Sequence, residues 1–290
     1  MQDNKKEVKG KIYIVSTPIG NKDDITIRAM NSIKRSDFII CEEIKAGART
    51  LKNLNISKEL VALNEHNEIE VTNDIIQRIK NGEKASLISD DGTPLIADPG
   101  NYFIRNALRE NIEIEVVPGV TSIITALVRS GFATNEFVFA GFVSQKSEEK
   151  LKNIKDLANE SRTVVLLEAP YRLSAILETF NKIIPNRRAY IGMNLTHPYE
   201  THHYGTFEQL YEQFKDYKLK SEFVICFEGT EFRKIHKKSI SEKVNYRQIT
   251  NKKFSDKPRK SQNKFSENKN SRSNFSKRNS EKRNNTKFKK

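Results

Sequence analysis

The sequence lacks the short motifs that mark the commonest nucleotide and metal sites. It contains no GxGxxG fingerprint and no Walker A sequence with its Lys and Ser/Thr, so neither a dinucleotide-binding fold nor a P-loop is supported. No CxxC or HExxH spacing links its five histidines, and a metal site is therefore not expected; they are His66, His197, His202, His203 and His236. Any cofactor site in this chain must be built from other loops.

Cysteine is scarce, and long hydrophobic runs are missing. The two cysteines, Cys41 and Cys226, each fall inside an apolar, strand-like run, which predicts buried, reduced thiols in a reducing, cytoplasmic compartment. No stretch approaches the ~20 consecutive apolar residues that a membrane-spanning helix needs. Residues 1–11 are polar and have no signal-peptide core. These absences predict a soluble intracellular protein without a membrane partner.

Acidic residues are scarce at one end of the chain only. Residues 231–290 contain 21 Lys and Arg but 5 Asp and Glu, a balance of +16, whereas residues 1–230 carry −2. The segment has no glycine and no apolar periodicity, and its hydrophobicity is too low to offset the entropy of ordering it. We therefore expect residues 233–290 to be a disordered basic tail and residues 1–10 a disordered N-terminus.

Four phenylalanines recur in this tail at intervals of about ten residues, among Lys, Arg, Asn and Ser. They are Phe254, Phe265, Phe275 and Phe288. Cations neutralise phosphates and isolated aromatic rings stack on unpaired bases, so the tail favours nucleic acid, and RNA in particular, as a partner. The alternative is a solubilising tail without a specific partner.

Apolar strand-like runs alternate with helical patterns over the rest of the chain. The first set predicts strands at 12–15, 38–41, 61–63, 85–88 and 113–117 with helices at 25–34, 48–53, 71–81 and 102–111. The second predicts strands at 137–140, 163–167, 189–193 and 223–227 with helices at 123–129, 148–159, 173–184 and 207–214. Such alternation predicts an α/β protein of two lobes, residues 11–118 and 119–232, with mostly parallel or mixed sheets.

Three loops rich in Gly, Pro, Ser and Thr follow strands of the first set. They are STPIG at 16–20, SDDGT at 89–93 and PGVTS at 118–122. Ligands of open α/β sheets bind outside the carboxyl ends of the strands, where small side chains let backbone amides approach. The loops thus predict a cofactor site in a cleft between the lobes, with Thr121 and Ser122 as helix N-caps. Each loop taken alone could equally be an ordinary turn.

Seven ordered motifs carry a family resemblance over residues 11–229. They are STPIGNKDDITIRA (16–29), NEHNE (64–68), LISDDGTPLIADPG (87–100), VVPGVTSIITAL (116–127), FVFAGFVSQK (137–146), LLEAPYRL (166–173) and LTHPYET (195–201). In these motifs the chain resembles the tetrapyrrole-methylase superfamily of S-adenosylmethionine-dependent methyltransferases. Within it, the chain looks like the branch that methylates a cytidine 2′-hydroxyl of bacterial 16S rRNA.

The resemblance implies a two-lobed homodimer that binds S-adenosylmethionine in the cleft between its lobes. By motif position, the cofactor-binding residues would be Pro18, Asp90, Gly92, Thr93, Pro94, Leu95, Thr121, Ser122, Leu167 and Glu168. The hydroxyls of Thr93, Thr121 and Ser122 suit the methionine amine and carboxylate. Pro18, Pro94 and Leu95 suit an apolar wall for the adenine.

The chain departs from the family pattern in three places. Where the family commonly has AEDTR and RELTK, this sequence reads CEEIK at 41–45 and MNLTH at 193–197, which puts the substrate contacts there in doubt. Some members carry a small helical domain at the C-terminus, and here the basic tail stands in its place.

Methylation of a ribose hydroxyl benefits from a nearby base, because the neutral hydroxyl is a poor nucleophile. We predict His66 of the NEHNE segment as that base, oriented by Glu65, with Glu43 and Glu200 as alternatives. Polar loop residues that only fix a turn or bind ribose would look the same. His202 and His203 are expected at the surface.

Five basic residues in or beside the motifs could also contact the rRNA backbone; they are Arg28, Lys45, Arg49, Lys146 and Arg172. Lone basic residues on a folded domain are, however, usually solvated surface.

Three functions of different class fit these observations. The first is an S-adenosylmethionine-dependent enzyme that methylates 16S rRNA, free or within the 30S subunit. The second is a methyltransferase of the same fold acting on a small tetrapyrrole-like molecule, and the third is a catalytically silent RNA-binding relative. The basic tail and the NEHNE segment favour the first, because a small-molecule enzyme has no need of a strongly cationic tail.

Overall fold

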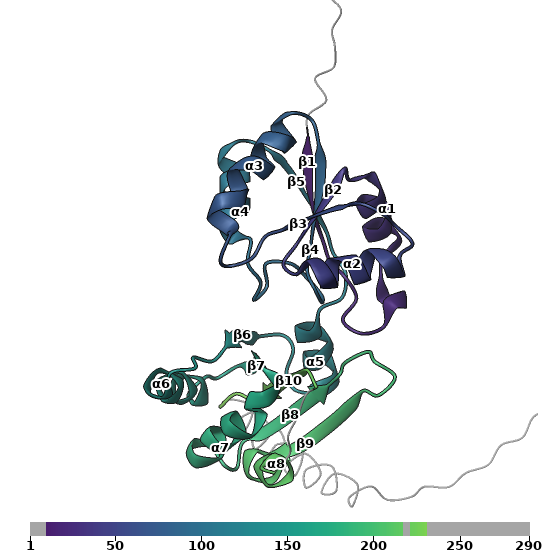
Figure 1. Ribbon diagram of the computed structural model, residues 1–290. Helices are drawn as coiled ribbons and strands as arrows, with labels where there is room; N and C mark the ends of the chain where they lie inside the picture. The colour runs from purple at the N-terminus through teal and green to yellow at the C-terminus, as the bar shows by residue number, and fades with distance from the viewer. Residues whose placement is uncertain (1–9, 217–220, 231–290) are drawn as a thin grey trace, which may run out of the picture. The chain divides into compact units, whose positions relative to one another are not determined.

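The computed structural model describes residues 10–216 and 221–230. The predicted disordered N-terminus, apart from Gly10, and the predicted tail from 233 lie outside the described residues. The described residues form two five-stranded sheets with helices packed against them (Figure 1). Within the described ranges, no helix is both long and apolar enough to cross a membrane.

The first sheet is parallel throughout and has the strand order β3-β2-β4-β1-β5. Its strands are β1 (Lys11–Val15), β2 (Phe38–Cys41), β3 (Glu59–Ala62), β4 (Lys84–Ile88) and β5 (Glu113–Val117). The central strands β2 and β4 are almost completely buried because helices cover both faces of the sheet. Helices α1 (Ile27–Arg35) and α2 (Ile44–Asn53) cover one face, and α3 (Glu68–Lys80) and α4 (Asn101–Arg109) cover the other (Figure 1).

The second sheet is mixed, with the order β6-β7-β10-β8-β9. Its strands are β6 (Phe137–Phe142), β7 (Thr163–Glu168), β8 (Arg188–Met193), β9 (Thr201–Thr206) and β10 (Phe223–Phe227). Only β6 and β7 pair in parallel, and the other neighbours are antiparallel. Helix α5 (Ser122–Ser130) packs on one face, whereas α6 (Ser147–Ala158), α7 (Leu173–Ile183) and α8 (Phe207–Phe214) pack on the other. The predicted α/β class with parallel and mixed sheets is confirmed.

Aromatic side chains fill the core between the second sheet and its three-helix layer. The rings of Phe180 on α7 and Phe207 on α8 stack with centroids 4.4 Å apart, and Phe227 of β10 lies 5.2 Å from Phe180. All three side chains are fully buried. This packing fixes the position of β10, whose first residues reach the site described below.

The structure corrects two expectations from the sequence. Strand β9, with the polar sequence THHYGT, was not predicted, and it pairs with β8 at the edge of the second sheet. His202 on β9 was expected at the surface, but its side chain is largely buried, and the hydroxyl of Tyr190 lies 2.9 Å from its Nδ1. Cys41 and Cys226 are free and buried, as predicted.

Candidate functional site

The three loops at the carboxyl edge of the first sheet are joined by hydrogen bonds. The backbone N–H of Thr17 donates to the carbonyl of Gly92 over 2.8 Å. The hydroxyls of Ser16 and Thr93 lie 3.0 Å apart, and the Thr93 hydroxyl also reaches the carbonyl of Val120 at 3.3 Å. The loops after β1, β4 and β5 therefore form one preorganised surface rather than three independent turns.

Two glycines allow this close contact between loops. Gly92 has a φ of +88°, a left-handed conformation that side chains disfavour, and a Cβ there would lie 3.2 Å from Ile19. A Cβ at Gly119 would lie only 2.8 Å from the Cβ of Ser16. A larger residue at either position would push the loops apart.

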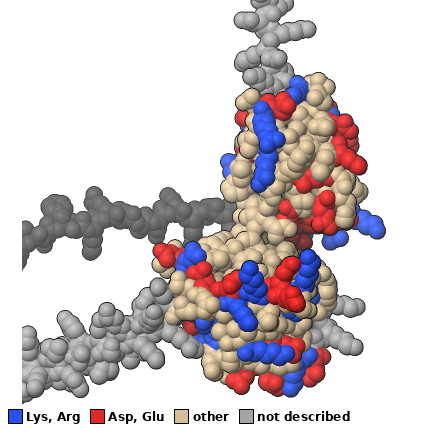
Figure 2. Space-filling view, turned by 90° about the vertical axis from the view of Figure 1, so that its left-hand side faces the viewer, with Lys and Arg blue, Asp and Glu red and all other residues tan. Residues whose placement is uncertain are grey.

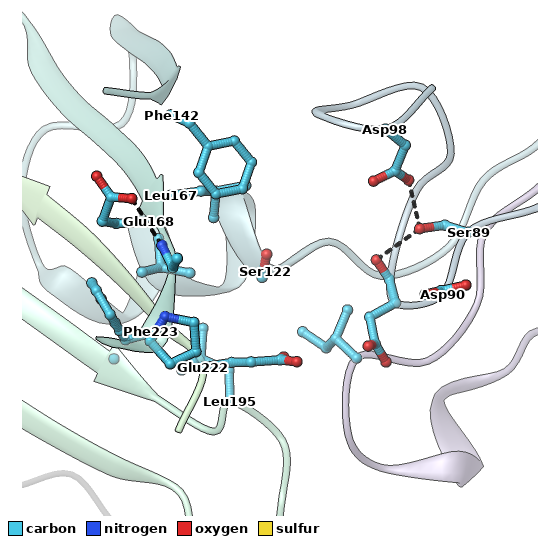
Figure 3. A pocket seen from close by; sticks show the side chains of 16 residues that line it. Ser89, Asp90, Asp98, Ser122, Phe142, Leu167, Glu168, Leu195, Glu222 and Phe223 are labelled. Atoms are coloured by element: carbon cyan, nitrogen blue, oxygen red, sulfur yellow. Dashed lines mark hydrogen bonds between the residues drawn. The ribbon is translucent and has the colours of Figure 1, made fainter. Parts of the chain in front are cut away.

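A cavity of about 370 Å³ lies between these loops and strand ends of the second sheet. Figure 3 shows Ser89, Asp90 and Asp98 on one side of it and Leu167, Glu168 and Phe223 on the other. We call this the first cavity. It is lined by Ile19, Ser89, Asp90, Asp91, Asp98, Ser122, Phe142, Leu167, Glu168, Ala169, Pro170, Gly192, Leu195, Glu222, Phe223 and Val224. Its walls thus combine an apolar surface with several carboxyl groups.

Two carboxylate oxygens of the first cavity are buried without a hydrogen-bond partner; they are Oδ1 of Asp90 and Oε2 of Glu168. The residue Glu168 is only 4% exposed, and its other oxygen accepts from the N–H of Ala169 at 2.9 Å and lies 3.0 Å from Arg172. A buried acceptor without a partner is costly. A ligand that carries hydrogen-bond donors or positive charge would satisfy both oxygens.

Burial raises the pKa of the carboxyl groups around this cavity. Desolvation is the main cause at Asp90, Asp98 and Glu168. Asp91 is exposed toward the cavities, yet its pKa is raised to about 7. Desolvation of its carboxyl is the largest cause. Repulsion from Glu222, Asp90 and Asp98 adds to it. A cluster of acids whose charged forms are disfavoured attracts a cation, which would restore their ordinary ionisation.

A second cavity, of about 770 Å³, shares Asp90, Asp91 and Glu222 with the first. Basic side chains of the first-sheet half, Lys22 and Arg49, contribute to its wall together with His197 from the loop before β9. A third, smaller cavity of about 100 Å³ is lined by the Gly92–Thr93 and Thr121–Ser122 segments.

The predicted cofactor residues fall into three groups in the structure. Asp90, Ser122, Leu167 and Glu168 line the first cavity. Gly92, Thr93 and Thr121 line the third cavity, and Pro18 the second. Pro94 and Leu95 line none of these three cavities, and Leu95 packs against the core of the first sheet instead. The apolar wall of the first cavity comes from Ile19, Leu195, Phe223 and Val224, which sequence reasoning did not identify.

The predicted catalytic residues lie apart from these cavities. The side chains of His66 and Glu65 are 85% and 79% exposed, with 3.5 Å between Nε2 and Oε1, and neither residue lines a cavity described here. Glu43 is the exposed N-cap residue of α2. Glu200 contacts Nε2 of His202 at 2.8 Å and also accepts from the N–H of Thr196, so both of its oxygens are engaged.

The basic residues of the motifs differ in their surroundings. Arg172 is largely buried and donates to the carbonyls of Val143 and Ser144, so it joins backbone segments and is not a free surface cation. Lys146 is exposed and pairs with Glu149. Arg28 and Lys45 are also exposed. Arg49 is exposed as well, and it lines the second cavity.

Sequence reasoning missed Asp91 and Glu222. Asp91 lies within the motif at 87–100 but looks like any other polar loop position there. Glu222 precedes β10 and has no motif around it. The two residues can be identified only from the structure, in which both line the first and second cavities.

Comparisons with known proteins agree with this architecture. Residues 11–211 match the family Tetrapyrrole (Corrin/Porphyrin) Methylases. Ribosomal RNA small subunit methyltransferase I of Rickettsia prowazekii (strain Madrid E) is 39% identical over 77% of this chain and 79% of its own length. The protein of the same name from Thermotoga maritima is 33% identical over 77% of this chain and 100% of its own.

Solved structures support the fold. A uroporphyrin-III-C-methyltransferase from Thermus thermophilus superposes with a TM-score of 0.56 at 21% identity, covering 76% of this chain and 94% of its own. A diphthine synthase gives a TM-score of 0.59 at 14% identity, covering 76% and 90%. The chain therefore belongs to the tetrapyrrole methylase family and, within it, to the ribosomal RNA small subunit methyltransferases I.

Proposed function

We propose that this protein transfers the methyl group of S-adenosylmethionine to the 2′-hydroxyl of a cytidine in bacterial 16S rRNA. Family membership supports methyl transfer to rRNA. The single observation that carries the proposal is the acidic first cavity with its two unpartnered carboxylate oxygens, which opens beside a larger cavity with basic side chains.

The residues of the first cavity fit S-adenosylmethionine. Its sulfonium and ammonium groups give the cofactor two positive charges against one carboxylate, and Asp90, Asp91, Asp98 and Glu222 supply negative charge around the cavity. The unpartnered oxygens of Asp90 and Glu168 can accept from its amine, amino or hydroxyl groups. Ile19, Leu195 and Val224 can cover its adenine. When bound, the cofactor supplies an electrophilic methyl group.

The chain's own contribution is positioning and charge. The hydrogen-bonded loops would hold the cofactor in a fixed position beside the second cavity, and alignment with the acceptor would lower the barrier by several kcal/mol. In this proposal Thr93 acts by joining the loops after β1, β4 and β5, since its hydroxyl contacts Ser16 and Val120. Thr121 and Ser122 remain available to the methionine end of the cofactor.

The proposal extends to assembly and location. We place the enzyme in the cytoplasm, in agreement with two free, buried cysteines. Homodimer formation is supported by exposed Ile124 and Val128, which follow each other at helical i,i+4 spacing on α5. The 30S subunit is the proposed substrate form.

The test is transfer of tritium from labelled S-adenosylmethionine to 30S subunits that lack their native modifications, followed by mass mapping of the labelled nucleotide. We expect label on a ribose 2′-oxygen of one 16S cytidine. Label on a base, or on 23S rRNA only, would contradict the proposal. Cofactor binding without any labelled RNA would favour a small tetrapyrrole-like acceptor or a silent RNA-binding relative.

A further inference from the structure

Asp91 occupies a special position among the residues that line the cavities. In the part of the chain that the structure describes, it is the one residue common to the first, second and third cavities. Its backbone carbonyl lies 3.1 Å from the hydroxyl of Ser89. Together with Asp90 and Glu222, Asp91 lies on the wall that the first and second cavities share.

The carboxyl group of Asp91 is not committed to another residue. Among the described residues it has no hydrogen-bond partner and no ion pair, whereas Asp98 accepts from Ser89 at 2.6 Å and Glu168 pairs with Arg172. An exposed carboxylate at the wall between two cavities is free to accept a hydrogen bond from a bound ligand.

The second cavity has the size and chemistry to hold a nucleotide. It is about twice as large as the first, and Lys22 and Arg49 on its wall carry the positive charge that flanking phosphates need. Asp90, Asp91 and Glu222 occupy the wall that it shares with the first cavity. A ribose in the second cavity can thus approach a methyl donor in the first beside these carboxyl groups.

We propose that Asp91 accepts the proton of the ribose 2′-hydroxyl of a nucleotide bound in the second cavity. This inference rests on the proposed function. The 2′-oxygen forms a bond to the methyl carbon, the sulfur–methyl bond breaks with its electron pair going to sulfur, and the hydroxyl proton passes to the Asp91 carboxylate and then to solvent. The products are the 2′-O-methyl nucleotide and S-adenosylhomocysteine, whose sulfur is uncharged.

The electrostatic surroundings suit this role. A general base works best when its pKa lies near the working pH, and in the protein without cofactor the pKa of Asp91 is raised to about 7. Desolvation is the largest cause, repulsion from Glu222 before β10 comes next, and Asp90 and Asp98 on its own loop add to it. Arg49 on α2 lowers the pKa. By contrast, His66 is exposed and lines none of the cavities described here.

The test compares Asp91→Asn with the wild-type protein and with Asp74→Asn, an exposed carboxyl on α3 that lines none of the described cavities. Single-turnover methylation of unmodified 30S subunits is measured at saturating cofactor and subunit. We expect Asp91→Asn to slow methyl transfer about 100-fold or more and Asp74→Asn to leave it unchanged. Calorimetric binding of S-adenosylmethionine should still be seen in Asp91→Asn, which shows that the variant is folded.

The pH profile separates proton transfer from a structural role. The wild-type rate should fall on the acid side as Asp91 becomes protonated, Asp91→Asn should lose that dependence, and Glu222→Gln should shift it to lower pH because it removes the largest repulsion that acts on Asp91. A rate for Asp91→Asn within threefold of the wild type, or a 100-fold loss in His66→Ala instead, would overturn the role of Asp91 alone. An inactive wild-type protein would reject the proposed function, and this inference with it.

Discussion

At the scale of single residues, the unpartnered oxygen of Glu168 gives a direct test of cofactor binding. Glu168→Gln keeps the shape of the side chain but removes its charge, and a hydrogen bond to a charged group contributes about 1.5–3 kcal/mol. We therefore expect S-adenosylmethionine to bind about 10- to 100-fold more weakly. Isothermal titration calorimetry measures the change.

Asp90→Asn should weaken binding in the same direction, since Asp90 holds the other unpartnered oxygen. The matched control is Glu178→Gln, because Glu178 is a half-exposed residue on α7 that pairs with Lys182 outside the cavity. Affinities of both cavity variants within threefold of the control would show that these oxygens do not contact the cofactor.

The raised pKa of Asp91 also predicts that the stability of the protein changes with pH. Its pKa is raised from 3.8 to about 7 in the folded protein, so the folded state binds the proton more tightly than the unfolded state. The stabilisation that protonation provides is complete below about pH 4 and is lost as the pH rises through about 7. Asp91→Asn, which mimics the protonated form, should raise the melting temperature more at pH 8 than at pH 5.

This comparison uses thermal melts of the wild type and Asp91→Asn at both pH values. His203, whose pKa is lowered by burial, changes stability in the opposite direction but equally in both proteins, so it cancels in the difference. An equal effect of the substitution at pH 5 and pH 8 would contradict the raised pKa. A variant that is more stable but inactive would indicate that the native carboxyl is kept for function at some cost in stability.

The candidate site could be predicted in part. Clusters of Gly, Pro, Ser and Thr after apolar runs predicted the positions of the three loops. The structure places Asp90, Ser122, Leu167 and Glu168 around one cavity. The apolar wall could not be predicted, because Leu195 and Val224 come from distant segments that only the second sheet brings together. Asp91 has the same local chemistry as Asp90, so only the arrangement of cavities distinguishes it.

At the scale of whole elements, burial explains which strands could be predicted. Strands β2 and β10 are fully buried apolar runs, and their predicted bounds agree with the structure. Strand β9 is polar and half-exposed because it pairs on one side only, so it has no periodic apolar signal. Helix α2 begins at Ile44 rather than at the predicted residue 48, since its first turn carries exposed side chains and little apolar pattern.

Strand β9 is held to the second sheet by a chain of polar contacts as well as by its backbone. Oε1 of Glu200 lies 2.8 Å from Nε2 of His202, and Nδ1 of His202 lies 2.9 Å from the hydroxyl of the fully buried Tyr190 on β8. With the proton on Nε2, the Tyr190 hydroxyl donates to Nδ1. Burial also raises the pKa of Tyr190, which keeps that hydroxyl protonated.

Replacing His202 should therefore destabilise the protein. His202→Ala leaves the hydroxyl of Tyr190 without its partner, and an unsatisfied buried polar group costs about 1–3 kcal/mol. Urea denaturation measures this change in the free energy of unfolding. In a Tyr190→Phe background the same substitution should cost less, because the hydroxyl is absent; an equal cost in both backgrounds would show that the contact contributes nothing.

At the scale of the whole molecule, charge is divided between two parts of the chain. Residues 1–230 carry a balance of −2, and on the face in Figure 2 acidic and basic side chains are interspersed. Residues 231–290 carry +16 and lie outside the described residues. A nearly neutral folded part with an acidic cavity attracts a small cation but gives little general affinity for a polyanion. We therefore predict that affinity for RNA depends on the basic segment.

Removal of residues 233–290 tests this division. Every phosphate that the shortened chain no longer neutralises should reduce the slope of log affinity against log salt by about 0.7–0.9, so truncation should weaken binding to 16S rRNA and flatten its salt dependence. The affinity for S-adenosylmethionine should not change, because every residue that lines the first cavity lies before 233. Filter binding at several salt concentrations measures the first effect and calorimetry the second. Unchanged RNA affinity and slope would assign RNA binding to cations of the folded part, where Lys22 and Arg49 beside the second cavity are the first to substitute.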